Sequence, residues 1–208
     1  MRRNLLVGGV IRVIGAFVVV TVMGAGTPAS AAGGVDGTGT GGSCPVAGKI
    51  GLKPALAGFP SPDTTPPATV KIGAKSVKGS PCTGGTGDGA NVLSMKTSGS
   101  GTTPHSSCSS LVGTNMVTFT VTVKWKSAKG TPKLNPSTIT ITSATGGVAG
   151  DGNATFDATG SVTAGSFTGN SVTAHIETTS MSGDLATACN GKGIKKLAFT
   201  ANSTFTLN

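Results

Sequence analysis

The stretch VTFTVTVKWK, residues 117–126, decides the fold class of this chain. Its apolar side chains fall at every second position from Val117 to Trp125, and threonine or lysine stands between them. A period of two is typical of a β-strand that packs one face on a core and leaves the other in water. The residue types agree, because β-branched and aromatic side chains suit a pleated, half-buried surface.

The same alternation recurs along the rest of the chain, between turn signals such as Asn135-Pro136 and Gly169-Asn170. The other strands that we expect cover residues 49–56, 69–78, 91–97, 138–142, 156–162, 172–176 and 197–207. Helical periodicity is confined to short stretches such as 108–111. About eight short strands predict an all-β fold, a single antiparallel β-sandwich or barrel, and the sequence leaves the choice between the two open.

The first 31 residues have the three parts of a secretory signal peptide. Arginines stand near the start, an apolar run covers residues 13–23, and Ala29-Ser30-Ala31 provides a cleavage site. A retained membrane anchor over residues 5–23 is the alternative, but Arg12 interrupts that run. We therefore expect a secreted, extracellular protein, with no transmembrane segment after cleavage. A flexible glycine-rich leader at 32–43 and a single β-domain at 44–208 would follow.

Four cysteines remain after the predicted cleavage, and an even number in an exported chain predicts disulfides. A long hairpin folded at the proline-rich residues 59–67 would bring its outer ends together, which favours a Cys44–Cys82 bridge. The second bridge is then Cys108–Cys189. A structural zinc site is disfavoured, because no C-x-x-C pair is present.

The mature chain keeps 13 lysines, no arginine and seven acidic residues, so its formal charge is 13 − 7 = +6. A positive charge favours anionic partners in general. Nucleic acid is disfavoured, because arginine makes the bidentate contacts to phosphates and guanine edges. One Trp and no Tyr also leave few platforms on which bases could stack.

A basic patch is the one candidate binding site. It consists of Lys124, Lys126, Lys129, Lys133, Lys192, Lys195 and Lys196. Such a patch would suit an anionic cell-envelope polymer or lipid head groups. The alternative is that lysines on strands only keep the protein soluble and prevent pairing between sheet edges.

No catalytic, metal or cofactor site is predicted. His105 lies in a loop-like stretch, and His175 has the parity of a solvent-facing strand position. Asp157 and Glu177 also have outward parity, which disfavours a cleft with two facing carboxylates. The chain has no G-x-S-x-G elbow, although Ser, His and Asp from distant segments could still meet in space.

The resemblance to known proteins rests on three segments, Cys44–Ile50, Val123–Gly130 and Cys189–Thr200. They resemble segments of a group of small exported proteins of actinobacteria. The resemblance implies an exported β-protein and supplies no catalytic residue.

Together these features predict a non-catalytic exported β-domain that acts by binding or as a component of the cell envelope. Its partner would be an anionic polymer or another secreted protein, and the oligomeric state stays open. An exported hydrolase without a motif is one alternative. A secreted inhibitor that presents the loop at 57–68 to a partner protein is another.

Overall fold

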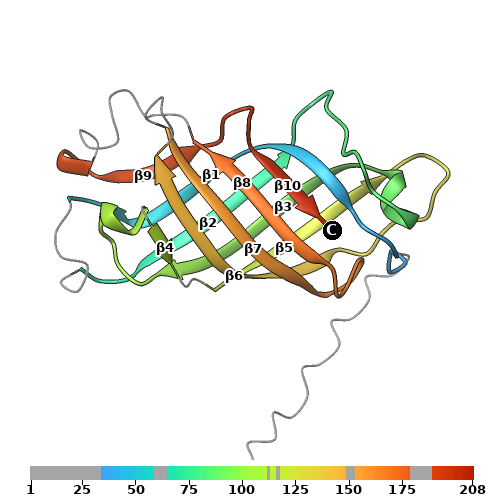
Figure 1. Ribbon diagram of the computed structural model, residues 1–208, viewed down its shortest axis with the longest axis horizontal. Helices are drawn as coiled ribbons and strands as arrows, with labels where there is room; N and C mark the ends of the chain where they lie inside the picture. The colour runs from blue at the N-terminus through green and yellow to red at the C-terminus, as the bar shows by residue number, and fades with distance from the viewer. Residues whose placement is uncertain (1–33, 59–64, 112, 116–117, 149–152, 179–188) are drawn as a thin grey trace, which may run out of the picture.

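The chain folds as a closed antiparallel β-barrel in a computed structural model (Figure 1). The structure describes residues 34–58, 65–111, 113–115, 118–148, 153–178 and 189–208. The predicted signal peptide therefore lies outside the described residues, as do residues 59–64 of the loop at 57–68. No helix within the described ranges is long and apolar enough to cross a membrane.

Eight strands close the barrel. They are β1 (Gly42–Leu56), β2 (Ala68–Ser76), β3 (Val92–Thr103), β5 (Phe119–Ser127), β6 (Ser137–Val148), β7 (Ala154–Ala164), β8 (Ser171–Glu177) and β10 (Thr204–Leu207). The short β4 (Gly113–Asn115) pairs with β6. Two 3-10 helices, η2 (Gly87–Asn91) and η3 (Cys108–Leu111), lie at opposite ends of β3. Figure 1 shows the strands running obliquely to the long axis of the barrel.

The closing seam of the barrel lies between β1 and the C-terminal strand. Residues 42–45 of β1 pair with β10, and its later residues 49–56 pair with β9 (Ile194–Ala198) along the same edge. Every other neighbour in the order β10-β8-β7-β6-β5-β3-β2-β1 is hydrogen-bonded as well. The all-β prediction is confirmed, and the open choice between sandwich and barrel resolves to a barrel.

Inward and outward positions alternate as the sequence predicts. On β5, Phe119, Val121, Val123 and Trp125 are buried, whereas Thr120, Lys124 and Lys126 are exposed. The strand expected at 197–207 is two strands in the structure, β9 and β10, which both pair with β1. β1 and β3 are longer than the sequence suggested, since β1 begins at Gly42 and β3 continues to Thr103. Glycine and serine interrupt the apolar alternation in β1 and β3, so that alternation alone covers only part of each strand.

One end of the barrel is tightly filled, and we call this end the barrel floor, defined by Val123, Trp125, Leu134, Phe167 and Val172. All five are at most 8% exposed. The rings of Trp125 and Phe167 pack edge to face with centroids 5.3 Å apart. The Trp125 indole N–H also donates a hydrogen bond of 2.8 Å to the Ser137 hydroxyl. This end therefore has an ordinary close-packed core.

The glycine-rich residues 34–41 pack against this floor, which differs from the flexible leader that we expected. The Gly37 amide donates a hydrogen bond to the Ser166 hydroxyl, and the Phe167 amide donates one to the Gly37 carbonyl. A Cβ atom on Gly37 would lie 2.8 Å from Leu134 and 3.2 Å from the Phe167 ring. Glycine here permits a close approach of backbone to core, which composition alone cannot distinguish from a linker.

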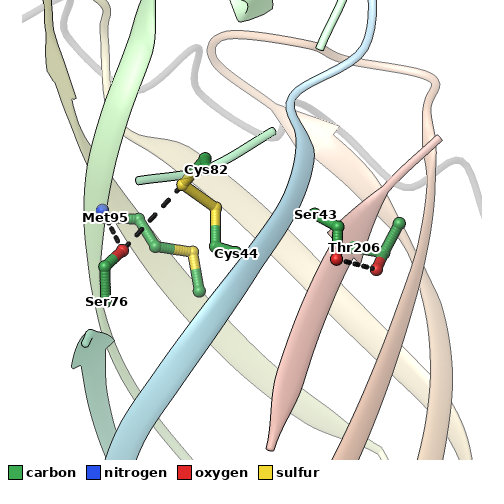
Figure 2. Close-up of a disulfide and its surroundings, with 6 residues drawn as sticks. All are labelled: Ser43, Cys44, Ser76, Cys82, Met95 and Thr206. Carbon is green, nitrogen blue, oxygen red and sulfur yellow. Dashed lines mark hydrogen bonds between the residues drawn. A yellow bond between two sulfur atoms is a disulfide. The ribbon is translucent and has the colours of Figure 1, made fainter. Parts of the chain in front are cut away.

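Both predicted disulfides are present, Cys44–Cys82 and Cys108–Cys189. Figure 2 shows the first, which joins β1 to the segment after β2 near the floor. Beside it, the Ser76 hydroxyl accepts a hydrogen bond of 2.8 Å from the Met95 amide, and Thr206 donates one to Ser43 across the closing seam. Cys108 and Cys189 come after the ends of β3 and β8 that point away from the floor. Each end of the barrel therefore has one disulfide.

Candidate ligand-binding site

The barrel interior beyond the floor contains an apolar cavity of about 140 Å³. Inward-facing side chains from β1, β2, β3, β5, β6, β7, β8, β9 and β10 line it. The lining residues are Val46, Ile50, Leu52, Val70, Ile72, Ala74, Met95, Thr97, Thr103, Phe119, Val121, Ile141, Ala144, Gly146, Phe156, Ala158, Ala174, Ile176, Leu197, Phe199 and Phe205. An eight-stranded barrel is just wide enough either to be filled by its own side chains or to hold one small ligand.

Small inward residues are the reason that this half of the barrel is hollow. Ala144, Ala158 and Ala174 lie opposite one another on β6, β7 and β8, in successive cross-strand pairs. All three line the cavity and are half-buried. A leucine or phenylalanine at these positions would occupy volume that the alanine methyl groups leave empty. The alanine row therefore creates the space that the floor lacks.

Aromatic rings supply much of the remaining wall. Phe119, Phe156, Phe199 and Phe205 come from four different strands or strand ends and all line the cavity. The Phe119 ring lies over Gly101, its cross-strand partner, where an added Cβ would lie only 1.7 Å from the ring. The ring needs this glycine, because any side chain at position 101 would displace it.

Among the described residues that line the cavity, the hydroxyls of Thr97 and Thr103 are the only polar side-chain groups, and both have backbone partners. The Thr97 hydroxyl accepts a hydrogen bond from the Ala74 amide, and the Thr103 hydroxyl donates one of 2.7 Å to the His105 carbonyl. None of these described lining residues is charged. The described lining consequently offers dispersion contacts and removal from water.

The basic patch expected from the sequence is divided in the structure. Lys124 and Lys126 lie on β5, with Lys129 and Lys133 in the following loop. Lys192, Lys195 and Lys196 lie on or just before β9, and β1, β2 and β3 separate that strand from β5. All seven lysines are exposed, so they are accessible to a partner without forming one compact site.

The histidines and carboxylates do not converge on a cleft among the described residues. His175 and Asp157 are cross-strand neighbours on the outer face, with Nδ1 and Oδ1 2.7 Å apart and side chains 45% and 65% exposed. Glu177 accepts hydrogen bonds from Asn153 and Asn202. His105 follows the end of β3, whereas Asp88, which accepts hydrogen bonds from Thr38, precedes its start. The positions of His175, Asp157 and Glu177 agree with the outward parity read from the sequence.

Metal binding has no candidate site within the described ranges, since no three His, Cys, Asp or Glu residues are close enough to share an ion. Comparison of the chain with protein-family models, with curated proteins and with solved structures finds no match. The candidate site therefore depends on the geometry of the cavity alone.

The cavity is the feature that the sequence reasoning missed. A signal was present, because alanine or glycine occupies inward positions of β6, β7 and β8, at Ala144, Gly146, Ala158 and Ala174. Reading that signal requires knowing that these strands are neighbours and that the sheet closes around them.

Proposed function

We propose that the protein is a secreted, non-catalytic binding protein that carries one small, uncharged, apolar molecule inside its barrel. The apolar cavity of about 140 Å³ is the observation on which this proposal depends. A cavity of similar size, about 150 Å³, lined by aliphatic and aromatic side chains stays dry and binds benzene. The expected ligand is consequently a single ring or a short hydrocarbon chain.

The chemistry of the lining supports an apolar ligand rather than a polar one. A polar group brought into the cavity would exchange its hydrogen bonds to water for a described lining with few polar groups, the Thr97 and Thr103 hydroxyls, which already have backbone partners. An apolar molecule loses nothing comparable and leaves water at a gain of about 25 cal/mol for each Å² of apolar surface buried. The lost hydrogen bonds and the gain from burial together select a ligand by its polarity, and the cavity volume selects it by size.

Export is the second part of the proposal. The signal peptide predicted at 1–31 and the two disulfides support it, because disulfides persist in oxidising compartments. N-terminal sequencing of protein from the culture medium should give Ala32 as the first residue. Recovery only from a membrane fraction, with residues 1–31 retained, would show that the segment is an anchor.

A thermal-shift titration of the mature protein with benzene, toluene, butylbenzene and octanol tests the binding proposal. At a ligand concentration 100 times Kd, stability should rise by about 2.7 kcal/mol. For a domain of this size that corresponds to an increase in Tm of about 5–10 °C. Glucose and acetate, which are polar, should leave Tm unchanged.

Two matched variants show where the ligand binds. Ala174→Phe fills the cavity and should abolish the shift, while Ala198→Phe places the same ring at an exposed position of β9 and should preserve it. Circular dichroism of both variants checks that the barrel has formed. The proposal is wrong if no apolar compound raises Tm, or if folded Ala174→Phe responds as the unmodified protein does.

A further inference from the structure

The outer wall of the barrel is divided by charge. β1, β2, β5 and β9 carry two lysines each and β3 carries one, which makes nine on strands that are neighbours in the sheet. None of these five strands has a carboxylate. The other side of the wall, β6, β7, β8 and β10, has no lysine and carries Asp157 and Glu177. The positive charge therefore covers one half of the barrel surface.

Three of these lysines form a row across adjacent strands. Lys75 on β2 pairs directly with Lys96 on β3, and Lys96 pairs directly with Lys124 on β5. All three are exposed, and we call them the lysine row. Side chains at directly opposite positions have Cβ atoms about 5 Å apart, and like charges so placed destabilise a sheet. Lys71 and Lys126 extend the same surface along β2 and β5.

No carboxylate relieves this repulsion within the described part of the chain. The ion pair between His175 and Asp157 lies on the opposite side of the barrel. Protection of sheet edges does not account for the row either, because β2 and β3 are paired on both sides and a closed barrel removes its edges. An external anion is the remaining source of compensating charge.

We propose that the lysine row is the centre of a binding surface for a flexible, linear polyanion. The shape of the wall favours a chain over a membrane. Each strand of an eight-stranded barrel takes up about 45° of the circumference, so the lysines of β9 and β5 point in nearly opposite directions. A planar lipid surface could contact only a few of them at once, while a flexible chain can follow the curve.

The residue types define what the surface can recognise. Lysine is a compact point charge, whereas arginine provides the planar fork that fits one anion geometry. The chain has no arginine beyond Arg12, so binding should depend on the density of negative charge rather than on the identity of the anion. The exposed positions of these strands also lack aromatic side chains, which stack on nucleic-acid bases. Long-chain inorganic polyphosphate is therefore a suitable probe.

Binding of fluorescently labelled polyphosphate to the mature protein tests the proposal. The variant Lys75→Gln/Lys96→Gln/Lys124→Gln removes the row, and Lys129→Gln/Lys133→Gln/Lys192→Gln removes the same charge from exposed positions outside the strands. We expect the first variant to lose at least tenfold in affinity and the second less than threefold. The slope of log K against log salt should fall by about three in the row variant, one for each lysine.

Three outcomes would overturn the proposal. Equal losses in the two variants would mean that only net charge matters, and the absence of polyphosphate binding would mean that the lysines serve solubility. Tighter binding to phosphatidylglycerol vesicles than to polyphosphate would assign the surface to a membrane. The toluene-induced thermal shift should be the same in both variants, so the result is independent of the cavity proposal.

Discussion

The two halves of the barrel interior are built by the same strands and packed in opposite ways. On β8, Val172 is 1% exposed in the floor, whereas Ala174, the next inward residue, lines the cavity. On the floor side Trp125 and Phe167 fill the barrel, and on the other side the row Ala144, Ala158 and Ala174 leaves it empty. Alternation thus decides which side chains point inward, and their volume decides whether the interior becomes a core or a binding site.

Removing either disulfide, one at each end of the barrel, should have the largest effect on the free energy of unfolding. Removing Cys108–Cys189 as a double alanine variant should cost about 4.5 kcal/mol, and removing Cys44–Cys82 about 3.9, because the closed loops span 81 and 38 residues. Urea denaturation followed by circular dichroism measures both. Loss of Cys108–Cys189 should also weaken toluene binding, since this bridge lies at the cavity end of the barrel. Unchanged affinity in that variant would show that the bridge does not shape the site.

Removal of an aromatic ring should have unequal effects in the two halves. Phe167→Ala takes a fully buried ring from the floor and should destabilise the barrel by about 3–5 kcal/mol. Phe156→Ala removes the same atoms from a half-buried position beside the cavity and should cost less than half as much. Similar losses of unfolding free energy would indicate that the cavity is as well packed as the floor.

Added side-chain volume should also affect the two halves unequally. Val172→Leu overpacks the floor and should cost about 1–3 kcal/mol. Ala174→Leu adds volume to empty space and should be neutral or stabilising by up to about 1 kcal/mol. The midpoint of urea unfolding distinguishes the two variants, and destabilisation by both would contradict the hollow interior.

The smallest effect is expected on the outer wall. Lys96→Thr removes the middle charge of the lysine row and should stabilise the barrel by roughly 0.2–1 kcal/mol at low salt. The gain should shrink as salt screens the repulsion. Lys129→Thr, in the loop after β5, is the matched control and should leave stability unchanged at all salt concentrations.

Much of the barrel could be predicted from local sequence, and the sites could not. Alternation identified the inward face of β5, and the proline-rich segment between Cys44 and Cys82 correctly indicated their pairing. The cavity depends on Ala144, Ala158 and Ala174 becoming neighbours, and the lysine row depends on Lys75, Lys96 and Lys124 falling in register. Strand order and register are long-range properties, and a shift of one residue would turn every side chain to the other face.

The sequence also misjudged residues 34–41, for a related reason. Their glycines suggested a flexible leader, but in the barrel the same residues lie against Leu134 and Leu207, where a Cβ would collide. A glycine that permits close packing has the same local signature as one that permits freedom of the backbone. Only the tertiary partner distinguishes the two.

A methyl NMR titration of the mature protein with toluene tests the central claim most directly. If the cavity is hollow and the floor is solid, the methyl resonances of Ala158 and Ala174 should shift with toluene concentration until they saturate. Those of Val123 and Val172 should move little. Shifts confined to outward methyl groups such as Ala198, or no saturable shift at all, would contradict the account.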